Sequence, residues 1–154
     1  TFGGTLGSTT GGADDLTITA GTGAVTFTGA VTMIDNDLTV ASSQNSVVTA
    51  GIGGSTGALT VTDSGSTDVN GAIALTGAGT VTLDAATVGA DVTTVGGAIA
   101  FGGAVTGDKG SGTAIGTGAG AGNVTFGGTL GLTTGGADDL TITAARERNP
   151  SPER

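Results

Sequence analysis

The chain alternates short apolar and polar runs with clusters of glycine, alanine, aspartate and asparagine. Runs such as Leu16–Thr19, Leu59–Thr62 and Leu140–Thr143 carry an aliphatic side chain at every second position, with threonine between them. Successive side chains of a strand point to opposite faces, so this period of two predicts strands with one apolar face. No segment has the period of an amphipathic helix, and the sequence therefore predicts an all-β protein.

The spacing of these runs indicates how the strands are arranged. The strongest strand starts, Leu16, Leu38, Leu59 and Val81, lie roughly 20 residues apart, which is the length of one coil in a solenoid. We therefore expect a right-handed parallel β-helix (β-solenoid) of about seven coils, with these residues and those two positions later stacked in its interior. A β-sandwich is the alternative, although the hairpin signal Asn-Gly occurs only once, at Asn70-Gly71.

An internal repeat supports the solenoid. Residues 1–20 recur at 125–144 with one difference, Ser8 against Leu132, and such self-similarity is typical of repetitive arrays. Because the chain starts inside a repeat at Thr1 and shows no signal peptide, we expect it to be an internal segment of a longer protein. We expect residues 1–144 to form the repeat segment. Residues 145–154, which hold every Glu, Arg and Pro, are expected to be a cap on the last coil or a non-native extension.

Composition narrows the classes of function. The chain has 33 glycines in 154 residues, and it has no Cys, His, Trp or Tyr. The missing Cys and His remove thiol nucleophiles, disulfides, common zinc sites and histidine acid–base catalysis. Before residue 145 the charged residues are eleven Asp and Lys109, so the body is too acidic to attract nucleic acid or an anionic membrane surface. We therefore expect no enzymatic activity, no nucleic-acid partner and no membrane insertion.

The amino-acid sequences of the repeats resemble those of a known family. The segments 11–31, 57–93 and 96–108, for example GGADDLTITAGTGAVTFTGAV, resemble the repeats of filamentous-haemagglutinin-like, autotransporter-like β-strand-repeat adhesins of bacteria. The resemblance implies a parallel β-helix on the cell surface or secreted from the cell. It implies a structural or adhesive role as a stiff stalk, spacer or filament subunit, with a host surface or the extracellular matrix as partner.

Clusters of aspartate form the first candidate site. Hard oxygen ligands lie close together at Asp14 and Asp15, at Asp35 and Asp37, and at Asp138 and Asp139. Calcium takes six to eight oxygen ligands, often from Gly-rich loops, so calcium is the one cofactor that these residues suggest. Aspartate also occupies turns because its side chain accepts hydrogen bonds from nearby backbone N–H groups. The sequence leaves both explanations open.

Threonines form the second candidate site. The Thr-x-Thr pairs, if stacked on one face, would form a flat array similar to the ice-binding face of β-solenoid antifreeze proteins. The ordinary explanation is that threonine is favoured on the outward face of a strand. The candidate residues are Thr17, Thr19, Thr26, Thr28, Thr60, Thr62, Thr80, Thr82, Thr141 and Thr143.

The repeat also predicts self-association. If the first and last coils present the same residues, the end of one molecule can continue the stack of another. Strand edges would supply the hydrogen bonds, as in β-augmentation. Head-to-tail association into open filaments is therefore a hypothesis of the sequence.

Overall fold

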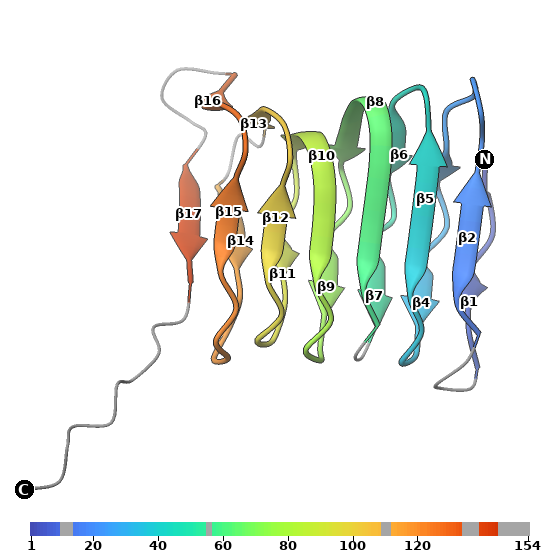
Figure 1. The fold of residues 1–154 in the computed structure, drawn as a ribbon, viewed down its shortest axis with the longest axis horizontal. Helices are drawn as coiled ribbons and strands as arrows, with labels where there is room; N and C mark the ends of the chain where they lie inside the picture. Colours follow the sequence, from blue (N-terminus) through green and yellow to red (C-terminus); the bar gives the residue numbers. More distant parts are fainter. Residues whose placement is uncertain (10–13, 55–56, 109–111, 134–138, 145–154) are drawn as a thin grey trace, which may run out of the picture.

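The chain winds as a stack of parallel β-coils. The structure, a computed structural model, describes residues 1–9, 14–54, 57–108, 112–133 and 139–144. In these residues every regular element is a β-strand and all paired strands run parallel (Figure 1). The β-solenoid is thereby confirmed over the β-sandwich, which needs antiparallel sheets. None of these residues belongs to a helix long and apolar enough to cross a membrane.

Each coil contributes to three faces of the solenoid. Face 1 consists of β2 (Leu16–Thr19), β5 (Leu38–Ser42), the first part of β8 (Leu59–Val69), the first part of β10 (Val81–Val88), β12 (Ile99–Phe101) and β15 (Val124–Phe126). Face 2 consists of β3 (Thr26–Phe27), β6 (Ser46–Val48), the second parts of β8 and β10, β13 (Val105–Gly107) and β16 (Leu130–Leu132). Face 3 consists of β1 (Leu6–Gly7), β4 (Val31–Met33), β7 (Ile52–Gly54), β9 (Ile73–Leu75), β11 (Val92–Thr93), β14 (Thr113–Gly116) and β17 (Leu140–Thr143).

The interior is the apolar ladder that the sequence predicts. On face 1, Leu16 pairs with Leu38, Leu38 with Leu59, and Leu59 with Val81. The residues two positions later stack in the same way, and the central members of both columns are fully buried. A shift of one residue would turn each apolar column outward, so the alternation of apolar and polar residues fixes the register.

The coils are less uniform than the sequence suggests. Their length, measured between paired residues, changes along the chain: Leu16 to Leu38 spans 22 residues, Val81 to Ile99 spans 18, and Ile115 to Ile142 spans 27. The longer coils near the C-terminus reduce the number to about six, close to the seven expected. The corners absorb the difference, and one of them lies inside paired strands: β8 and β10 shift register where Leu83 pairs with Val61 but Ala85 pairs with Ser66.

A sequence typical of turns lies inside a strand. Asp63, Ser64 and Gly65 are residue types that favour turns, but they belong to β8 where it bends from face 1 to face 2. Asp63 is buried, and its Oδ2 accepts hydrogen bonds from the Ser46 N–H and the Thr67 hydroxyl, both at 3.1 Å. These bonds replace part of the hydration of the buried carboxylate, whose Oδ1 has no hydrogen-bond partner among the described residues, and they allow a corner of the core to hold an aspartate.

The two copies of the repeat lie at opposite ends of the solenoid but on different faces (Figure 1). Leu16 is in β2 on face 1, whereas its counterpart Leu140 is in β17 on face 3. Five ladder steps lead from β2 to β15, and β17 lies two faces further on, so the 124 residues between the copies make five and two-thirds coils. Each copy is therefore turned by one face relative to the other.

Candidate functional site

The aspartates at the corner before face 1 join one coil to the next. Asp15 Oδ1 accepts a hydrogen bond of 2.9 Å from the backbone N–H of Asp37, one coil further along the stack. Asp37 Oδ1 in turn accepts a bond of 2.7 Å from the Ala58 N–H. The Asp91 carboxylate does the same at the corner before face 3, toward the Ala114 N–H at 3.0 Å. These side chains extend the main-chain ladder around the corners, and their bonds join residues 21 to 23 positions apart instead of neighbours within one turn.

The remaining candidate aspartates do not share one pattern of hydrogen bonds. The Asp14 backbone N–H donates to Asn36 Oδ1 at 3.1 Å, and Asp35 adopts φ of 54°, a left-handed conformation that aspartate accepts at turns. The Asp139 carbonyl accepts from the Thr113 N–H at 2.7 Å. Asp138 lies outside the described residues. The part of the chain that the structure describes contains no group of three or more Asp, Glu, His or Cys side chains placed to hold a metal ion.

The threonines divide among the faces. The outward column of face 1 runs Thr17, Thr39, Thr60, Thr82, Ala100 and Thr125, so three of the predicted residues stack there with two that the prediction left out. In the next column Ala41 separates Thr19 from Thr62.

The other predicted threonines lie elsewhere. Thr26 is in β3 on face 2 and Thr28 follows it, whereas Thr141 and Thr143 are in β17 on face 3, and Thr80 precedes β10. The structure therefore forms one column of threonines rather than a broad array.

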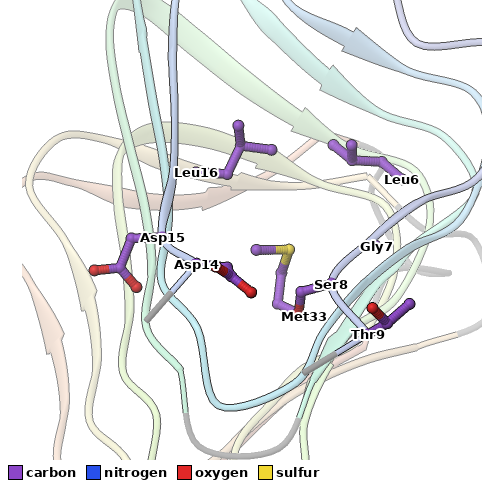
Figure 2. Close-up of a pocket in the computed structure, with 8 residues that line it drawn as sticks. All are labelled: Leu6, Gly7, Ser8, Thr9, Asp14, Asp15, Leu16 and Met33. Atoms are coloured by element: carbon purple, nitrogen blue, oxygen red, sulfur yellow. The ribbon is translucent and has the colours of Figure 1, made fainter. Parts of the chain in front are cut away.

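The N-terminal end of the solenoid is hollowed. A hollow of about 540 Å³ lies between the segment of β1 and the start of β2, and Figure 2 shows the Met33 side chain between these two segments. Leu6 and Leu16 border it from the two strands, and Ser8 and Asp15 lie close to them. Because β1 and β2 have a strand partner on one side only, their other edge faces away from the stack.

The C-terminal end carries a second hollow, which is lined by residues of the second repeat copy. It measures about 590 Å³ and is lined by Leu130, Gly131, Leu132, Asp139, Leu140 and Ile142. Five of these residues are the counterparts, 124 positions later, of residues that line the first hollow. The sequence repeat thus appears in space as two matching ends, which differ at the position that is Ser8 in one and Leu132 in the other.

Phenylalanines also mark the two ends. Phe2 stacks on Phe27 with ring centroids 5.3 Å apart, and Phe101 stacks on Phe126 at the same distance. These are all four phenylalanines of the chain. Sequence reasoning missed these pairs, although the repeated Val-Thr-Phe and Ala-Phe runs carry the signal.

Comparison with protein families, with curated proteins and with solved structures finds no match to this chain.

Proposed function

We propose that the chain is a stiff structural segment, which acts as a stalk, spacer or filament subunit and not as an enzyme. The observation that carries this proposal is the continuity of the three ladders. Each face has a strand from almost every coil, and the core columns pass from coil to coil without interruption by a large polar side chain on faces 1 and 3.

Continuous ladders resist bending for a physical reason. To bend the stack, the hydrogen bonds on one face must lengthen while the close-packed core beneath the opposite face is compressed. Each coil contacts only its neighbours, so the stiffness of the stack is set by these repeated contacts. The aspartate bonds at the corners add coil-to-coil links outside the strands.

The proposed setting is the bacterial cell surface or the extracellular space. The resemblance of segments 11–31 and 57–93 to adhesin repeats supports this setting, as does a net charge of −9, which opposes non-specific association with other acidic surfaces. In that setting the segment would hold an adhesive domain away from the cell, toward a host surface or matrix.

Distances between spin labels test the rod. Labels at cysteines introduced for Thr17 and Thr82 lie three coils apart on face 1, and labels at Thr17 and Thr125 lie five coils apart. At about 4.8 Å per coil we expect separations of roughly 14 and 24 Å, each with a narrow distribution. Broad distributions, or separations that do not grow with the number of coils, would refute a stiff shaft.

A ligand-binding solenoid is the second candidate, and the threonine column of face 1 is the observation that favours it. Thermal hysteresis of a freezing solution tests ice binding, with Thr60→Lys as the variant that would abolish it. Melting in calcium and in a chelator tests the aspartates. If the aspartates act only through the hydrogen bonds of Asp15 and Asp37, the two melting temperatures will agree.

A further inference from the structure

We propose that this chain associates end to end with a second copy of itself, which is rotated by one face about the solenoid axis. The last coil of one molecule would pair with the first coil of the next. This inference rests on the proposed role as a structural shaft and names the partner of its ends. It is carried by four features of the two end coils.

The first feature is the apolar surface of the last coil. Leu130, Leu132 and Ile142 are 43%, 51% and 42% exposed, although all three continue columns that are buried in the preceding coils. They account for three of the five large apolar side chains that are exposed in the described residues. In a continuing stack these side chains would be covered by another coil.

The second feature is the order of the phenylalanines. With the second copy turned by one face, its Phe2 lies over Phe126, since these are equivalent positions of the repeat. The two existing pairs then join into one column of four rings: Phe101, Phe126, Phe2 and Phe27. Stacking of like on like at the spacing of the strands is what the interior of each molecule already shows.

The third feature is the single difference between the repeat copies. Leu132 lies over Gly107, whose missing side chain leaves room for it: a Cβ on Gly107 would be 2.8 Å from the Leu132 side chain. In the rotated stack the next residue over Leu132 is Ser8 of the second copy, which is also small. A large side chain between two small ones fits a close-packed interior.

The fourth feature is the direction of the backbone groups. Inward-facing residues direct their N–H and C=O toward the following coil: the Leu16 N–H donates to the Asp37 carbonyl, and the Phe2 carbonyl accepts from the Thr28 N–H. By this rule Phe126 and Leu130 direct theirs away from the body of the molecule. Outward-facing residues of the first coil direct theirs toward the preceding coil. Donors and acceptors at the two ends are therefore complementary.

The rotation follows from the faces on which the first coil begins and the last coil ends. Without rotation, β1 would lie over β17 on face 3, but β2 of the second copy would have no strand beneath it at the next position of face 1. Turned by one face, Phe2, β1 and β2 lie over β15, β16 and β17 in that order. All three ladders then continue without a missing strand.

Disulfide trapping tests both the contact and the rotation, and the absence of natural cysteines leaves no background thiol. Thr141→Cys in one molecule lies over Thr17→Cys of the other in the rotated stack, but over Thr5→Cys in the unrotated stack. The separation of neighbouring strands, about 4.8 Å, lies within the Cα range of a disulfide. We expect the mixed disulfide of positions 141 and 17, identified by mass spectrometry, and only background with Thr82→Cys. Trapping of 141 with 5 alone would overturn the rotation, and trapping of neither would overturn the association.

Sedimentation across a concentration series gives an independent test. Leu132→Lys with Ile142→Lys should weaken association by about tenfold or more, because a buried leucine contributes at least that factor. Val95→Lys is the matched control, since Val95 is 53% exposed and lies outside the last coil. Equal weakening in both variants, or a monomer at all concentrations, would overturn the inference. If the spin-label distances still grow with the number of coils, the proposed stiff segment would remain supported although its ends do not associate.

Discussion

Ile73→Ala should destabilise the solenoid far more than Ile142→Ala, although both residues belong to one column. Face 3 stacks Leu6, Val31, Ile52, Ile73, Val92, Ile115 and Ile142 in register. Ile73 is 0% exposed and Ile142 is 42% exposed. The same chemical change is thus made in the middle of the stack and at its end.

The expected magnitudes follow from burial. Truncation to alanine removes three carbon groups, worth about 2.4 kcal/mol when fully buried. At Ile73 the two neighbouring coils cannot collapse onto the space, so a cavity term brings the loss to about 3–4 kcal/mol. At Ile142 only about 58% of the residue's surface is buried in the folded chain, and truncation leaves no closed cavity. The expected loss of stability is therefore roughly 1.4 kcal/mol.

Urea titration followed by circular dichroism measures the difference, because the chain has no Trp or Tyr for fluorescence. Dilute protein keeps the ends of separate molecules apart, and Ile115→Ala, also at a fully buried position, serves as a second internal measurement. Equal losses at positions 73 and 142, or a larger loss at 142, would contradict the stacked interior from which the magnitudes are derived.

Four further predictions concern polar and glycine positions, and all are measured as the free energy of unfolding in the same titration. Asp37→Ala should lower stability by about 1 kcal/mol by removing the acceptor of the Ala58 N–H, and Asp37→Asn should restore most of it. Ser46→Ala should raise stability by about 1 kcal/mol, because the buried Ser46 hydroxyl has no hydrogen-bond partner. Thr67→Val should lower stability by about 1–3 kcal/mol, because it removes a hydrogen-bond donor to the buried Asp63 carboxylate. Gly71→Ala should lower it by about 2–3 kcal/mol, since a Cβ there would meet the Thr49 carbonyl oxygen at 2.5 Å, and a loss below about 0.5 kcal/mol would contradict the close packing of this corner.

Much of the fold could be predicted because two simple patterns specify it. Alternation decides which side chains face inward, and a spacing near 20 residues decides which of them meet. The pairing of Leu16, Leu38, Leu59 and Val81 follows from these two patterns alone.

The corners could not be predicted in the same way. Their lengths vary because glycine and aspartate permit many backbone conformations, so the 18-residue and 27-residue coils have no clear signal in the sequence. The buried Asp63 shows the same limit. An aspartate followed by serine and glycine is typical of an exposed turn. Here it becomes part of the core through hydrogen bonds from the Ser46 N–H of the preceding coil and from the Thr67 hydroxyl of its own strand.

The repeat recurs after five and two-thirds coils instead of a whole number of coils, and this affects any array built from the unit. The same 20-residue sequence forms β1 and β2 on faces 3 and 1, and β16 and β17 on faces 2 and 3, so the faces are interchangeable as environments for it. If each copy advances the winding by five and two-thirds coils, a given residue returns to its original face only after three copies, or 17 coils. Surface features such as the threonine column would then be distributed around the axis instead of along one side. A shaft built in this way has no preferred direction of bending, which suits a spacer better than a module that must present one flat face to a ligand.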